Sequence, residues 1–139
     1  MQNSIPKAAF SIIDYFFDKV NIDLANKPAN NELSISFDVA GVFNSKESTY
    51  ELTFVVGVVN NEHNDLVRVQ CRGIFNINDV HKEVDIPEFF YNNSIAILFP
   101  YVRSYISIVT SQAHIPGIIL PTLNLSSLGE QLKQNTRIE

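Results

Sequence analysis

The chain has no tryptophan, one cysteine and few basic residues, and each shortage argues against a class of protein. A single cysteine, Cys71, allows no internal disulfide and is typical of a protein from a reducing compartment. The 10 Lys and Arg residues are scattered along the chain, and the formal net charge is −5. Nucleic-acid binding needs clustered basic side chains that displace counterions from phosphates, so we expect no nucleic-acid partner.

Residues that carry chemistry are also sparse. His63, His81 and His114 fall in different predicted loops without a second ligand nearby, so we expect no metal site. The sequence shows no glycine-rich phosphate loop and no nucleophile elbow, and its carboxylates are spread over turns and strand faces. Cys71 continues the alternating apolar pattern before it, which predicts a buried small hydrophobe rather than a reactive thiol. We therefore expect neither an enzyme nor a bound cofactor.

Targeting and membrane-spanning patterns are likewise not found. The amino-terminal residues lack the basic region and uninterrupted apolar stretch of a secretory signal, because Ser11 and Asp14 break the apolar run from Ala8 to Phe17. No segment reaches the roughly 20 apolar residues that a membrane span needs. The length of 139 residues suits one domain, so we predict a single cytoplasmic domain over residues 1–139, without membrane insertion.

The first half of the chain alternates apolar and polar residues as half-buried strands do. The pattern predicts strands from Phe10 to about Leu24, from Leu33 to Ala40, from Thr49 to Val59 and from Val67 to about Arg72. One face of the third strand holds Tyr50, Leu52, Phe54, Val56 and Val58. The connections are mostly short polar turns, which predicts a four-stranded antiparallel sheet with one solvated face.

The second half is predicted to be helical, which makes the fold class α+β. The stretch Asp85–Glu88 resembles a helix start, with Asp85 as the cap and a proline in the first turn. A longer C-terminal helix is expected to begin near Ile97, because Pro100 is best tolerated in a first turn. An aliphatic connector, Ile115–Leu125, leads to a short final helix from about Asn124, and the tail from Lys133 is expected to fray.

One arc of the longer helix is polar but carries almost no charge. Small polar side chains permit the close approach of another helix or sheet, so we interpret this arc as a subunit contact, with plain solvent exposure as the alternative. Besides Thr110, the arc holds the predicted contact residues Arg103, Ser104, Ser107 and Ser111.

Apolar residues also occur where a small domain is expected to be polar, namely at the start of the first strand, late in the third strand and in the connector. They can pack against another copy of the chain or line a groove for an extended apolar polypeptide, and the two interpretations are compatible. The predicted polypeptide contacts are Phe10, Ile12, Phe16, Phe54, Val56, Ile115, Ile118, Leu120, Leu123 and Leu125.

Three stretches of the sequence form a set: Gly73-Ile74-Phe75, the run Ile97-Leu98-Phe99-Pro100-Tyr101-x-Arg103-x-x-Ile106-Ser107, and the stretch from Leu120 to Leu128. Together, and with weaker similarity back to Phe10, they resemble the SecB family, tetrameric chaperones that hold secretory preproteins unfolded for the Sec translocase. The resemblance implies a homotetramer built as a dimer of dimers, with the long helices between the dimers. It also implies apolar grooves that hold non-native polypeptides, bordered here by the loop from Ile115 to Leu123.

The same resemblance implies a docking surface for the translocase motor, which the family forms with acidic residues on the outer face of the sheet. Here Leu66 falls on the family's apolar contact and Asp23 keeps one acid, whereas Lys19 and Arg68 stand where acids are expected. Like charges across a docking surface weaken binding. Delivery to the Sec translocase and service to one client, such as an antitoxin, therefore stay open as alternatives. A different class, an α+β dimer that binds a small apolar ligand, also stays open.

Overall fold

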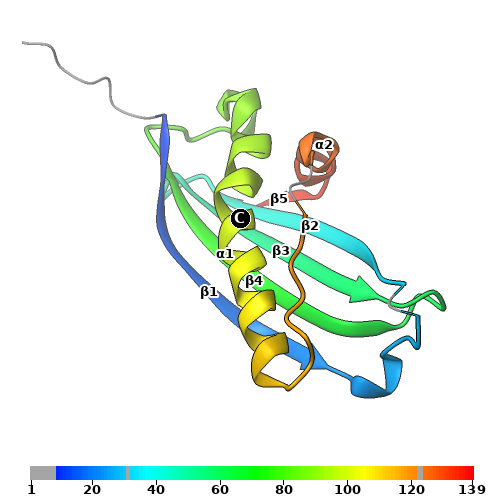
Figure 1. The fold of residues 1–139 in the computed structure, drawn as a ribbon. Helices are drawn as coiled ribbons and strands as arrows, with labels where there is room; N and C mark the ends of the chain where they lie inside the picture. Colours follow the sequence, from blue (N-terminus) through cyan, green and yellow to red (C-terminus); the bar gives the residue numbers. More distant parts are fainter. Residues whose placement is uncertain (1–8, 31, 122–123) are drawn as a thin grey trace, which may run out of the picture.

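A five-stranded sheet carries a long helix across one of its faces (Figure 1). The computed structural model describes residues 9–30, 32–121 and 124–139. The strands lie in the order β1-β4-β3-β2-β5. In chain order the elements are β1 (Phe10–Ile22), the 3-10 turn η1 (Leu24–Asn26), β2 (Ser34–Asn44), β3 (Thr49–Val59), β4 (Asp65–Ile77), the 3-10 turn η2 (Glu83–Asp85), α1 (Glu88–Gln112), α2 (Ser126–Gln134) and β5 (Thr136–Ile138).

The prediction of four antiparallel strands is correct for β1 to β4 but misses β5. This short strand pairs in parallel with Gly41–Phe43 of β2, so the sheet is mixed. Residues 136–138 had been assigned to a frayed tail. Three residues are too few to show a strand periodicity, and what holds β5 is its contact with β2 rather than its own sequence pattern.

The alternation predicted for β3 is confirmed, and it defines the core. Tyr50, Leu52, Phe54, Val56 and Val58 are all buried on the face that α1 covers. From β4, Val67, Val69 and Cys71 join them, while Arg68, Gln70 and Arg72 lie on the opposite, outer face. The inner face of the sheet is therefore the core, and its outer face is open to solvent.

β1 begins at Phe10 as predicted, but two register shifts interrupt its pairing with β4. They fall between Ile12 and Asp14 and between Phe17 and Lys19. Each β-bulge inserts one residue and resets which side chains face inward. The inner face consequently receives Phe10, Ile12, Tyr15, Phe17, Val20 and Ile22, a set without a period of two. The bulges explain why the start of this strand reads as apolar on both faces.

The expectation of a helix beginning near Ile97 is wrong, because α1 is one helix of 25 residues that starts at Glu88. Pro87 occupies its N-cap, so the predicted start signal around Asp85–Glu88 belongs to this long helix. Pro100 lies inside α1 and is exposed. Proline leaves the carbonyl of Ala96 without its helical donor, and the exposure of Ala96 lets water replace it. Burial of Leu98, Val102 and Ile106 against the sheet holds the helix together there.

α1 is long and apolar enough to cross a membrane by length and composition, which the sequence reading did not anticipate. Nine of its 25 residues are buried, and seven of these are apolar residues of the core. The same composition is usual for the core helix of an α+β domain.

Candidate functional site

A groove of about 660 Å³ runs between α1 and the connector. Figure 1 shows the connector returning alongside α1 from the C-terminal end of that helix to α2. Two of the lining side chains are isoleucines with large exposed fractions, 58% for Ile108 and 73% for Ile119. The groove is lined by Phe99, Pro100, Arg103, Ser104, Ser107, Ile108 and Ile119.

Thr110 of α1 fixes the connector wall of this groove. Its side chain is fully buried, and its hydroxyl donates to the Ile106 carbonyl at 2.7 Å and accepts from the Ile118 amide at 3.0 Å. The Thr110 carbonyl accepts a further hydrogen bond from the Ile115 amide. The sequence places Thr110 on the polar arc of the helix, and its burial corrects that prediction. Its hydroxyl satisfies the backbone amide of Ile118, which lies outside the helices and strands.

The small serines of α1 receive the connector of their own chain. A Cβ atom on Gly117 would lie 2.6 Å from Ser111 Oγ and 3.7 Å from the Ser107 carbonyl oxygen. Ser107 and Ser111 thus lie close to Gly117 of the connector in their own chain, and their contact with a second subunit stays a prediction. Arg103 and Ser104 lie on the groove wall.

The predicted polypeptide contacts do not form one surface. Phe54 and Val56 have no exposed area, so they are core residues and are not available to a client while the fold is intact. Ile115 and Leu120 are also buried, since they anchor the connector, whereas Ile118 and Leu125 are half-buried. Leu123 lies outside the described residues.

The predicted contacts on β1 lie away from the groove. Phe10 and Ile12 are half-buried at the inner edge, where the Phe10 ring packs edge-to-face on Phe90 with centroids 4.9 Å apart. Phe16 pairs with Arg72 in register and faces outward, on the opposite side of the sheet from the groove.

Sequence reasoning missed most of the residues that do line the groove. Ile108 lies one turn from Ser104 of the polar arc, and this spacing places it near the solvent face of the helix. Phe99 enters the sequence prediction only through the family pattern, and Pro100 only through that pattern and the expected helix start. Ile119 follows the buried connector residues by a single position, and no local periodicity distinguishes it.

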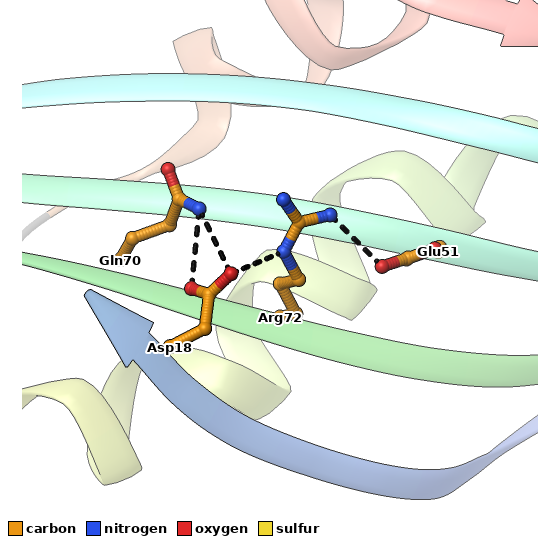
Figure 2. Close-up of polar contacts among 4 residues, drawn as sticks. All are labelled: Asp18, Glu51, Gln70 and Arg72. Carbon is orange, nitrogen blue, oxygen red and sulfur yellow. Dashed lines mark hydrogen bonds and ion pairs between the residues drawn. The ribbon is translucent and has the colours of Figure 1, made fainter.

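The outer face of the sheet carries an ordered set of charges (Figure 2). Asp18, the bulge residue of β1, accepts from Arg72 Nε at 2.7 Å and from Gln70 Nε2 at 3.1 Å. Arg72 also donates through Nη1 to Glu51 at 3.0 Å. The hydrogen bond from Arg72 holds the pKa of the Asp18 carboxyl below its ordinary value, and the two acids beside it raise the pKa of Arg72.

The residues predicted for motor docking are only partly free. Leu66 is buried, so it presents no apolar contact to a partner. Asp23 accepts from the Ala25 amide at 3.0 Å and caps η1. Arg68 lies 3.6 Å from Asp38 and 3.8 Å from Asp65. Within the described ranges Lys19 forms no ion pair, and its side chain is exposed opposite Gln70.

Cys71 is confirmed as a buried residue of the core. Burial, with a smaller contribution from the nearby Asp18, raises the pKa of its thiol to about 12. A thiol in this state is a poor nucleophile at neutral pH. Among the residues that the structure describes, no three His, Cys, Asp or Glu side chains gather to hold a metal ion.

The structure defines the class as an α+β protein in which a long helix covers one face of a sheet and a groove lies between that helix and the connector. The family model described as "Preprotein translocase subunit SecB" matches residues 8–136. The chain belongs to the SecB family, which confirms the resemblance.

Two curated relatives resemble the chain over most of its length. The protein-export protein SecB of Methylobacillus flagellatus is 31% identical over 133 residues, covering 94% of this chain and 75% of that protein. An uncharacterised protein of Methanocaldococcus jannaschii is 28% identical over 139 residues, covering 93% of this chain and 88% of that protein.

A solved structure shares the fold. A SecB-like chaperone of Mycobacterium tuberculosis, in complex with a peptide from an antitoxin, superposes with a TM-score of 0.66. The two sequences are 15% identical, and the match covers 84% of this chain and 91% of that one. At this identity the likeness shows the fold alone.

Proposed function

We propose that the protein is an ATP-independent holdase that binds non-native polypeptides in the groove between α1 and the connector. The observation that carries the proposal is the exposure of Ile108 and Ile119 on facing walls of a groove of about 660 Å³. Exposed aliphatic side chains in a groove favour an apolar ligand, and small polar side chains between them leave room for a backbone. Membership of the SecB family supports the same function.

The experiment is the refolding of a chemically denatured model enzyme with and without the chain. A holdase slows recovery of activity without nucleotide, in proportion to its concentration. Refolding at an unchanged rate would contradict the proposal and would favour an α+β protein with a small apolar ligand instead.

We also propose a cytoplasmic homotetramer, a dimer of dimers. The edge strand β1 supports self-association, because Ile13 and Val20 are exposed on it. Beside them, Tyr15 of β1 stacks on Tyr101 of α1 with ring centroids 4.2 Å apart. Both tyrosines keep about two fifths of their surface exposed. Four chains of 15.7 kDa make a particle of about 63 kDa, which light scattering distinguishes from a monomer or dimer.

Delivery of clients to the Sec translocase motor is the finer proposal, and the family description supports it. The positive charges of Lys19 and Arg68 on the outer face work against a motor surface that accepts acids. The second candidate is a chaperone for a single client, which the antitoxin peptide held by the M. tuberculosis protein favours.

Motor binding separates these two candidates. Lys19→Asp combined with Arg68→Glu is expected to strengthen binding to the motor, whereas Lys46→Asp, a single charge reversal of the same kind in the exposed β2–β3 turn, should leave it unchanged. Unchanged binding in the double variant would mean that this face does not dock the motor.

A further inference from the structure

β5 occupies part of an edge that otherwise lies open. It runs parallel to Gly41–Phe43 of β2, at the side of the sheet away from β1 (Figure 1). The Gly41 amide donates to the Asn135 carbonyl at 3.2 Å, and the Glu139 amide donates to the Phe43 carbonyl at 2.8 Å. The outward-facing amide of Gly41 and the outward-facing carbonyl of Phe43 are therefore hydrogen-bonded to the C-terminal segment.

The same edge of β2 continues beyond β5, and among the described residues no other strand pairs with it. Backbone groups of alternate residues point the same way, so those of Ile35, Phe37 and Val39 also face outward. The Val39 carbonyl accepts from Asn135 Nδ2 at 3.0 Å. In the part of the chain that the structure describes, the outward groups of Ile35 and Phe37 have no partner.

This open edge adjoins the groove. The ring of Phe37 lies 6.4 Å from that of Phe99, which lines the groove. β2 pairs with β3 without a bulge, whereas β1, at the opposite edge, has two. Bulges and charges discourage the addition of a strand, so the β2 edge is the one better suited to accept an extended chain.

A small set of polar contacts holds β5 in place. Thr136 Oγ1 donates to the Leu132 carbonyl at 2.7 Å, so Tyr50 Oη, 2.6 Å away, is the donor in their contact. A Cβ atom on Gly41 would lie 1.9 Å from Tyr50 Oη, and only glycine lets this hydroxyl reach β5. Apolar burial adds little, because Ile138 is 59% exposed. Elements held in this way are among the first to open.

We propose that β5 is a resident strand that competes with extended polypeptides for the β2 edge. This inference rests on the proposed holdase function. A client segment paired with Ile35 and Phe37 meets the C-terminal segment at Val39, and longer pairing requires β5 to leave. β5 thus keeps the edge next to the groove covered when no client is bound.

The test compares a variant in which a disulfide fixes β5 to β2 with a variant in which β5 has lost a hydrogen bond. Val42 and Arg137 are register partners on the outer face, so Val42→Cys with Arg137→Cys brings two thiols within reach of a disulfide. Thr136→Val removes the acceptor of Tyr50 at nearly constant volume. Thr53→Val, half-buried on the outer face of β3, is the matched control. The probe is reduced, carboxymethylated lactalbumin, followed by fluorescence anisotropy.

The oxidised pair should bind the probe at least about fivefold more weakly than the same protein after reduction, which is the effect of losing roughly one net hydrogen bond. The Thr136→Val variant should bind the probe at least about threefold more tightly than the Thr53→Val control. Exchange of the Glu139 amide proton should accelerate when the wild-type protein binds the probe.

Equal binding by the oxidised and reduced pair, or a Glu139 amide that stays protected in the complex, would overturn this inference and leave the holdase function standing. Absence of binding by every form, wild type included, would overturn the holdase function and this inference with it.

Discussion

The Ile118 amide lies 3.0 Å from Thr110 Oγ1, and through this hydrogen bond a buried hydroxyl of α1 holds the wall of the groove. The connector has few other polar ties to the helix. Its position depends on that hydroxyl together with the buried side chains of Ile115 and Leu120. The shape of the groove is therefore coupled to one fully buried side chain.

Thr110→Val should lower the free energy of unfolding by about 1–3 kcal/mol, because the Ile118 amide is left without an acceptor at nearly constant side-chain volume. Thr110→Ser keeps the hydroxyl and should cost less. Urea denaturation of the three proteins measures this. Equal stability of the valine and serine variants would show that the hydrogen bond does not hold the connector.

Ile119→Asp should weaken the binding of unfolded lactalbumin about tenfold without a change in unfolding midpoint, because the side chain is 73% exposed and lines the groove. Val84→Asp is the matched control, since Val84 is 85% exposed on η2 and is not part of this groove. Titration by fluorescence anisotropy measures both. Equal loss in the two variants would mean that any exposed aliphatic residue serves as well as the groove.

Asp18 should make folding stability depend on acid pH. Its folded pKa lies below its ordinary value of 3.8, so its contribution is complete above that value and is lost as the pH falls through the folded pKa. Asp18→Asn should flatten the decline of stability below about pH 4. Identical curves for wild type and Asp18→Asn would contradict the role of Arg72.

Pro100→Ala should stabilise the protein by about 1–3 kcal/mol, because it restores the amide donor to the Ala96 carbonyl in the middle of α1. Ser104→Ala, one turn later on the same face, should give only about 0.5 kcal/mol from helix propensity. Thermal unfolding measures the two. A destabilised Pro100→Ala variant would mean that the ring packs usefully in the groove.

Much of the fold could be predicted from the sequence, because a strand with one buried face alternates apolar and polar residues with a period of two. The inner face of β3, from Tyr50 to Val58, was found residue by residue, and Cys71 was placed in the core by alternation alone. Pro100 misled the helix prediction, since a local rule about amide donors is overridden by the packing of Leu98 and Val102.

The site was harder to predict, because its parts depend on contacts between distant segments. Ser111 is predicted as a contact residue, but Gly117 has no distinguishing pattern in the sequence, and only the fold shows that the two meet. β5 leaves almost no pattern in sequence, since Thr136 is placed by Tyr50, far away in the chain. Phe54 and Val56 were predicted as polypeptide contacts because they are apolar, but both side chains are fully buried in the core.

Binding of non-native polypeptides in the groove is tested by the aggregation of a chemically denatured model enzyme, followed by light scattering with no nucleotide present. The wild-type protein is predicted to suppress the scattering in proportion to its concentration, and the combined Ile108→Asp and Ile119→Asp variant, folded to the same extent by circular dichroism, to suppress it far less. Scattering that the wild type leaves unchanged, or that both proteins suppress equally, would contradict binding of non-native polypeptides in this groove.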